Sequence, residues 1–280
     1  MSVYTLENPY ISAAVSTVGA ELISLRGPDG EEQMWRGDGN IWGRSGPVIF
    51  PVLGGWPEGW YLHNGKRYCM DKNGFARSME FSALQEEKTA VKFELHSDEK
   101  TLRQYPVDFS MWVNYYIIGM ELHIVLSARN DSNEDMPAGV GLHPGFVWNR
   151  KREGARLVFS EYETLRAFHP DGVRYPFLDH SKEFELTENS FKNGAITMEH
   201  PKSRRIELYR PDMAWNLRLH CDGFSYFTLW SMDREDADFV CLEPTTNANT
   251  DGNTLAHRRG IITAAPGETL TREIVIELFQ

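Results

Sequence analysis

Strand-like patterns recur along the whole chain, whereas no convincing amphipathic helix of ten residues or more is present. Residues 107–118 are rich in aromatic and β-branched side chains, and residues 121–128 alternate apolar with polar ones. Gly119 and Met120 lie between these segments and predict a two-residue hairpin turn. Because turn residues also recur at short intervals, we predict an all-β fold, a large antiparallel β-sandwich. Further strands are expected at residues 10–15, 21–26, 205–209, 214–219, 226–230 and 270–279.

No charge-rich or Gly/Ser-rich linker interrupts the 280 residues, so we expect a single domain over residues 1–280. The formal net charge of −11 argues against binding to nucleic acid or to an anionic membrane, because both need a basic surface. It does not exclude a local arginine pocket for one small anion. The sequence contains nothing that resembles a signal peptide or a membrane-spanning helix. We therefore expect a cytoplasmic protein, either a monomer or a homodimer.

Metal and cofactor sites are not predicted. The three cysteines have neither metal-ligand spacing nor close pairing, and most of the histidines are scattered. A glycine-rich phosphate loop, a His-Glu-x-x-His helix and a Gly-x-Ser-x-Gly elbow are all missing. We expect chemistry that needs no cofactor and no metal.

Two short segments each place an ionisable residue directly before a proline. These are Gly-Leu-His143-Pro-Gly-Phe and Cys-Leu-Glu243-Pro-Thr. Proline biases the preceding residue toward extended backbone and cannot donate to a strand ladder, so both residues are expected at strand ends. Since the run before Glu243 is apolar, burial should raise the pKa of its carboxyl toward the range useful for a base. The alternatives are a structural role for His143 and a buried ion pair between Glu243 and an arginine.

Candidate substrate-binding residues come from other segments of the chain. Arg77, in Asn-Gly-Phe-Ala-Arg, and Arg44, in a Gly- and Trp-rich loop, are both suited to bind vicinal hydroxyls or an anion. Either arginine could instead form a surface ion pair. Asn73 can hydrogen-bond a hydroxyl, and tryptophans such as Trp230 can stack on a sugar ring or simply fill the core.

Together these segments resemble the aldose 1-epimerase (galactose mutarotase-like) superfamily and, within it, the LacX-type branch. The likeness covers most of the chain and includes Gly-Pro-Val-Ile-Phe-Pro51, Gly-Phe-Ala-Arg77 and the His143 and Glu243 segments. The resemblance implies a β-supersandwich that binds a sugar on its concave face, with Glu243 as catalytic base and His143 as acid. It also implies that Arg77 binds substrate and that Arg44 occupies a loop where related proteins often carry an arginine.

The chain departs from the family pattern in two places. Asn73 stands where the family usually has histidine, and an asparagine cannot carry charge near neutral pH. Thr245 follows Glu-Pro where the branch commonly has tryptophan.

We predict an aldose 1-epimerase that interconverts the anomers of a hexose or related sugar. His143 and Glu243 should lie within one sugar's width of each other, in a cleft lined by tryptophans. Two alternatives stay open: an inactive carbohydrate-binding protein on the same fold, or a hexose-6-phosphate mutarotase in which Arg44 and Arg77 clamp the phosphate.

Overall fold

The computed structural model describes residues 1–249 and 252–280. Its strands are β1 (Val3–Glu7), β2 (Ser12–Ser16), β3 (Glu21–Arg26), β4 (Val48–Ile49), β5 (Tyr61–His63), β6 (Lys66–Tyr68), β7 (Ser82–Glu87), β8 (Ala90–His96), β9 (Phe109–Ile118), β10 (Glu121–Asn130), β11 (Met136–Ala138), β12 (Gly141–Leu142), β13 (Gly145–Val147), β14 (Arg156–Phe168), β15 (Arg174–Glu185), β16 (Ile196–Glu199), β17 (Arg205–Tyr209), β18 (Asn216–His220), β19 (Tyr226–Trp230), β20 (Phe239–Thr245), β21 (Ile262–Ala264) and β22 (Thr269–Phe279). The helices are α1 (Glu99–Gln104) and two short 3₁₀ turns, η1 (Ala76–Ser78) and η2 (Leu255–His257).

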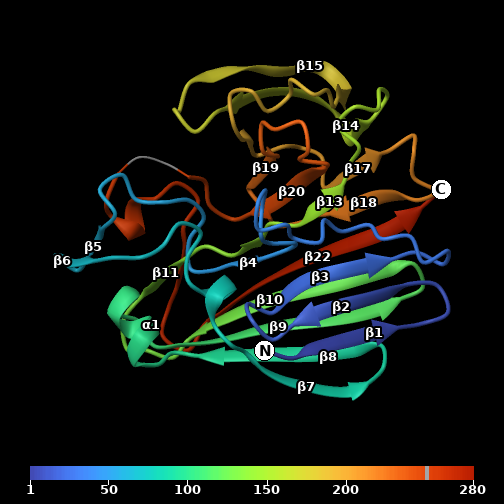
Figure 1. Cartoon of the computed structure of the whole chain (residues 1–280). Helices are drawn as coiled ribbons and strands as arrows, with labels where there is room; N and C mark the ends of the chain where they lie inside the picture. Colours follow the sequence, from blue (N-terminus) through green and yellow to red (C-terminus); the bar gives the residue numbers. More distant parts are fainter. Residues whose placement is uncertain (250–251) are drawn as a thin grey trace.

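Fifteen of the strands form one large sheet (Figure 1). Its order is β4-β12-β20-β19-β16-β14-β17-β18-β22-β10-β9-β8-β7, with β13 also pairing with β20 and β15 with β14. A three-stranded sheet, β1-β2-β3, packs against the β8–β9 end, where the ring of Tyr4 contacts Phe93 and the Tyr115 hydroxyl donates to the Ala20 carbonyl. The all-β, antiparallel prediction is confirmed.

Alternation in the sequence explains why the regular strands form where they do. Buried and less buried side chains alternate along β9 and β10, which pair from Ile118 opposite Glu121 onward. The turn predicted at Gly119 and Met120 is therefore confirmed, and Gly119 supplies the positive φ (+59°) that the turn requires. In the described part of the chain the only α-helix is the six-residue α1, and no helix there has the length and apolar character needed to cross a membrane.

Strand β20 positions the candidate site. All seven of its residues are buried, and it lies between β19 on one side and the short strands β12 and β13 on the other. We expected the proline after Glu243 to end this strand, but β20 continues through Pro244 to Thr245. The reason is that residues 242–244 lie opposite the break between β12 and β13, where the ladder is already interrupted and one missing N–H is tolerated.

Candidate active site

His143 lies in the break between β12 and β13, as its Pro144 neighbour predicts. Its backbone N–H donates to the Pro47 carbonyl, which holds the residue beside β4. Its ring is tilted 30° against Trp42 and stands nearly perpendicular to Trp230, with ring centroids 5.1 and 5.6 Å away. Two tryptophans therefore fix the orientation of the imidazole from two sides.

Glu243 faces this ring from β20. Its Oε1 lies 3.3 Å from Nε2 of His143, and both side chains are almost completely buried. The ion pair with an arginine that we considered for Glu243 is not found among the described residues, where its partner is His143. The predicted proximity of the two groups is confirmed, whereas their catalytic roles remain predictions.

Burial shifts the pKa values of both groups toward their neutral forms. Desolvation raises the pKa of Glu243 to about 8, against an opposing effect of the nearby Lys72 ammonium. Desolvation also lowers the pKa of His143 to about 3, and the positive charges of Lys72 and Arg77 add to this effect. Between these two values the pair carries a single proton. That proton can sit on either partner, as neutral histidine with carboxylic acid or as imidazolium with carboxylate.

A cavity of about 370 Å³ opens in front of the pair, within the range of roughly 300–1,000 Å³ typical of small-molecule sites. Its lining combines aromatic and other apolar side chains with several polar ones. The residues lining it are Trp42, Pro47, Leu53, Gly54, Lys72, Asn73, Arg77, His143, Phe168, His169, Pro170, Gly194, Ala195, Thr197, Thr228, Trp230, Glu243 and Asn249. An aromatic wall beside hydroxyl, amide and guanidinium groups suits the apolar face and the hydroxyls of a sugar ring.

Besides Glu243 and His143, four site residues were predicted, and three of these four line this cavity. They are Asn73, Arg77 and Trp230. The Nε atom of Arg77 is buried without a hydrogen-bond partner in the described structure, and burial lowers the pKa of its guanidinium. An uncompensated buried donor at a cavity wall is suited to a ligand oxygen.

Asn73 has a backbone role as well as a place in the cavity wall. Its φ is +66°, in the left-handed region that asparagine tolerates better than most residues. Its N–H donates to the Gly54 carbonyl at 2.9 Å, and its Oδ1 accepts from the Gly54 N–H at 2.8 Å. The amide oxygen is therefore engaged in holding the loop, so we expect any contact between Asn73 and a ligand to come from the amide nitrogen.

Arg44 does not line this cavity. Its Nη1 lies 3.1 Å from Oε2 of Glu21 and donates to the backbone carbonyl of Arg77 at 2.8 Å. It lines a different surface hollow beside β3. Arg44 thus forms an ion pair, which was the alternative to a binding role considered from the sequence. Its hydrogen bond to the Arg77 carbonyl supports that segment from outside the cavity.

The sequence reading missed several residues that line the cavity. Lys72 directly precedes Asn73, and Thr228 lies two residues before Trp230 on β19, so strand alternation could have revealed Thr228. Thr197 bonds Thr228 through their hydroxyls at 3.0 Å. Phe168 is the last residue of β14 and Pro170 lies in the β14–β15 connection, and no local pattern marks either of them.

One group in the described residues could offer three ligand atoms to a metal ion. His143, Cys241 and Glu243 place their ligand atoms within 4.8 Å of one another. However, burial raises the pKa of the Cys241 thiol well above its ordinary value, and only the thiolate is a good metal ligand. The group is better suited to proton transfer between His143 and Glu243 than to holding a metal.

The comparison with protein families agrees with this geometry. The family model described as aldose 1-epimerase matches residues 2–277. The chain belongs to the aldose 1-epimerase family. Among curated relatives, the plasmid-encoded Protein LacX of Lactococcus lactis subsp. lactis is 28% identical over 285 residues, which are 94% of this chain and 95% of that protein. The chromosomal Protein LacX of the same organism is also 28% identical.

Solved structures of the aldose 1-epimerase type have the same fold. A galactose mutarotase-like protein from Lactobacillus casei ATCC 334 superposes with a TM-score of 0.94 at 25% identity, covering 99% of this chain and 100% of that one. A galactose mutarotase related enzyme from Lactobacillus acidophilus gives a TM-score of 0.91 at 26% identity, covering 100% and 98%. The predicted resemblance to the galactose mutarotase-like superfamily and its LacX-type branch is confirmed.

Proposed function

We propose that the protein is a mutarotase that interconverts the α and β anomers of a hexose or related sugar. The observation that supports this most is the buried His143–Glu243 pair, 3.3 Å apart, at the wall of a sugar-sized cavity. Membership of the aldose 1-epimerase family agrees with it.

Anomer exchange requires the hemiacetal ring to open. The Glu243 carboxylate takes the proton of the C1 hydroxyl while the His143 imidazolium protonates the ring oxygen, and the C1–O5 bond breaks to leave an aldehyde. Rotation about C1–C2 presents the other face of the carbonyl, and the same two proton transfers in reverse close the ring. The overall effect of ring opening is to move one proton from His143 to Glu243 through the sugar.

The electrostatics of the pair fit this cycle. A pair that holds one proton has two arrangements, imidazolium with carboxylate and imidazole with carboxylic acid. The first arrangement is required by the closed ring, and the second accompanies the open aldehyde. Because burial disfavours both charges, it stabilises the arrangement that accompanies the less stable open form of the sugar.

The hexose-6-phosphate alternative is not supported in the form first considered. That form required Arg44 and Arg77 to clamp one phosphate, but only Arg77 lines the cavity of the pair. The other alternative is an inactive carbohydrate-binding protein, and the asparagine at position 73 in place of the usual histidine still favours it. Measuring anomer exchange distinguishes this alternative from a mutarotase.

The test is the rate of anomer exchange, followed by polarimetry or NMR over a panel of free aldoses. The wild type should accelerate exchange of at least one sugar, and Glu243→Gln should reduce that acceleration by at least about 100-fold. The amide keeps the shape of the side chain but cannot accept the C1 proton, so sugar binding should be largely retained. A Glu243→Gln variant within a few-fold of wild type would assign the base to another group, and a wild type that binds sugar without accelerating exchange would support the binding protein.

A further inference from the structure

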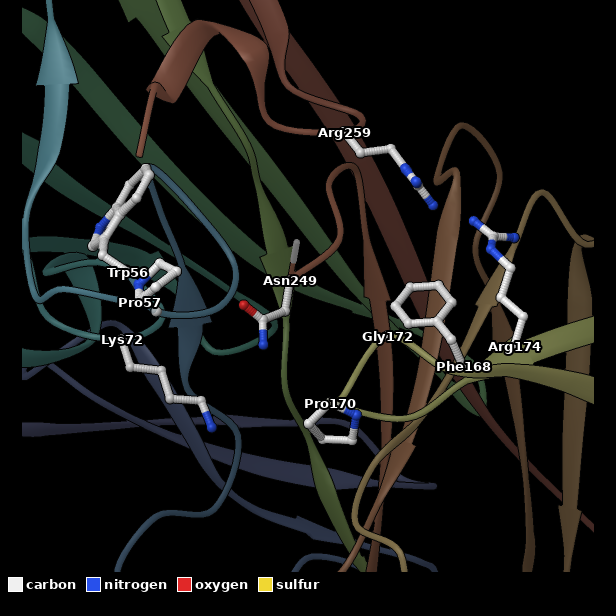
Figure 2. A pocket seen from close by; sticks show the side chains of 10 residues that line it. Trp56, Pro57, Lys72, Phe168, Pro170, Gly172, Arg174, Asn249 and Arg259 are labelled. Carbon is white, nitrogen blue, oxygen red and sulfur yellow. The ribbon is translucent and has the colours of Figure 1, made fainter. Parts of the chain in front are cut away.

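A second cavity, of about 580 Å³, adjoins the one that contains the His143–Glu243 pair. The two cavities share Lys72, Phe168, Pro170 and Asn249 as lining residues, so a ligand in one can extend into the other. Figure 2 shows this second cavity, with Lys72 and Trp56 on one side and Arg174 and Arg259 on the other. Nothing in the proposed ring-opening step uses this space.

The second cavity is lined by three cationic side chains and by no carboxylate, so far as the structure describes its walls. Arg174 enters from the start of β15, Arg259 from the segment between η2 and β21, and Lys72 from the loop before Asn73. In Figure 2 the two guanidinium groups point toward each other beside the ring of Phe168. The whole chain has a net charge of −11, so this cluster of positive side chains is a local feature of opposite sign to the net charge.

Glu199 orients the two arginines without neutralising the cavity. This residue at the end of β16 pairs with Arg174, and its Oε1 lies 2.8 Å from Nη1 of Arg259. One carboxylate between two guanidinium groups leaves a net charge of +1, and Lys72 adds a second positive charge. The side chains of Arg174 and Arg259 are 40% and 49% exposed, so donors on both remain accessible from the cavity.

Two guanidinium groups held at a fixed spacing are a typical arrangement for binding an oxyanion. Lys72 lies where the two cavities meet, and its charge also acts on both His143 and Glu243. Because the two cavities meet at Lys72, a substituent of a sugar ring placed against the His143–Glu243 pair has space to extend past Lys72 toward the arginines.

We infer that the second cavity is a subsite for an oxyanion substituent, a phosphate or a carboxylate, on the sugar whose ring occupies the first cavity. This inference rests on the proposed function for the placement of the ring. It assigns anion recognition to Arg174, Arg259 and Lys72, in place of the Arg44–Arg77 clamp expected from the sequence.

A purely structural role for the arginines makes a different prediction. Arg174 also lies over the ring of Phe168, at 5.5 Å, and could simply hold the tip of the β14–β15 hairpin. In that case a substitution would lower stability or weaken the binding of all sugars together. Recognition of an anion would instead change only the preference between charged and neutral members of one sugar series.

The experiment measures binding by calorimetry and anomer exchange by NMR for glucose and galactose, their 6-phosphates and their uronates. Wild type should bind either the 6-phosphate or the uronate of a sugar about tenfold or more tightly than the parent sugar. Whichever of the two shows the larger gain identifies the oxyanion. The double variant Arg174→Gln/Arg259→Gln should lose that preference while its affinity for the parent sugar stays within about twofold of wild type.

Arg103→Gln is the matched control, because Arg103 also pairs with a glutamate but lies on α1 and lines neither cavity. It should leave every value unchanged. Equal binding of neutral and anionic sugars by wild type, no binding of any anionic sugar, or an equal loss of both in the double variant overturns the subsite. If wild type still accelerates anomer exchange, those outcomes overturn the subsite alone and the proposed mutarotase function stands. Conversely, tight binding that depends on the anion, without accelerated exchange, supports the subsite and contradicts the proposed mutarotase function.

Discussion

At the scale of single residues, the distinctive feature is that His143 and Glu243 are buried side by side and the pKa of each is shifted toward its neutral form. Burial alone accounts for most of both pKa shifts, because an apolar environment disfavours imidazolium and carboxylate alike. Trp42 and Trp230, which contact the His143 ring, contribute to this environment while also forming the aromatic wall of the cavity. The same side chains that would bind the apolar face of a sugar therefore also desolvate the His143–Glu243 pair.

The pH dependence of the proposed anomer exchange follows from the number of protons that the His143–Glu243 pair holds. The pair holds one proton above about pH 3 and loses it as the pH rises through about 8, the raised pKa of Glu243. We expect kcat/KM for a neutral sugar, corrected for spontaneous exchange, to be flat from about pH 5 to 7 and to fall about tenfold per unit above the upper pKa.

Lys72 offers a check on this assignment. Its positive charge lowers the pKa of Glu243, so Lys72→Gln should move the alkaline limb to higher pH with a neutral sugar as substrate. A limb that stays in place in the variant, or a profile that rises through pH 8, would contradict the assignment of the titrating group to Glu243.

At the scale of elements, the segment from Asn73 to Arg77 is held to the sheet by a close backbone approach. Gly74 has φ +72° and forms a bridge with Phe50, and a Cβ atom added to it would lie 2.1 Å from the Phe50 carbonyl oxygen. This contact places Asn73 and Arg77 at the cavity wall. The short turn η1 then carries Arg77 itself.

A substitution at Gly74 tests how much the site depends on this contact. Gly74→Ala should lower the free energy of unfolding by more than about 1 kcal/mol, and it should weaken sugar binding because the segment must shift. Gly65→Ala is the matched control, since Gly65 also has a positive φ (+75°) but has no atom within 4 Å of the added Cβ. Denaturant unfolding and sugar titration of both variants provide the measurement. Equal losses in the two variants would show that φ strain alone, and not the approach to Phe50, is responsible.

The sequence predicted elements well wherever alternation is regular. The strands expected at residues 21–26, 205–209 and 226–230 match β3, β17 and β19 in full, and the one expected at residues 10–15 is displaced by about two residues relative to β2. By contrast, β14 and β15 were not predicted. Their pairing contains three register shifts, and these irregularities break the alternation on which the prediction depends.

The site could be predicted only in part for a related reason. His143 and Glu243 are marked by local sequence features, an apolar run and a following proline, which can be recognised without knowing the tertiary structure. Phe168, Arg174 and Arg259 reach the cavities through sheet pairings and loops far from those motifs, and nothing in their own neighbourhoods distinguishes them from surface residues. Arg44 shows the converse, since its glycine-rich loop suggested a binding role while Glu21 holds the side chain elsewhere.

At the scale of the whole molecule, the last strand joins the two parts of the main sheet. β22 pairs with β10 on one side and with β18 on the other, so strands β7 to β10 connect to the half that carries β20 only through β22 in the order of the sheet (Figure 1). Ile276 lies in the middle of this strand, fully buried, opposite Leu122 and Leu219. β22 thus links the two parts of the main sheet through hydrogen bonds on both of its edges.

We therefore predict that the two halves unfold together, as expected of one domain over residues 1–280. Unfolding followed by far-UV circular dichroism and by tryptophan fluorescence should give coincident transitions, because Trp42 and Trp230 pack against Phe239 of β20 and report that half, while the far-UV signal reports every strand. Ile276→Pro removes a ladder donor from a central strand and should abolish folding of both halves, whereas Ile276→Val should cost only about 0.5–1.5 kcal/mol. Two separated transitions in wild type, or a proline variant in which β7 to β10 remain protected from hydrogen exchange, would show that the halves on either side of β22 are independent units.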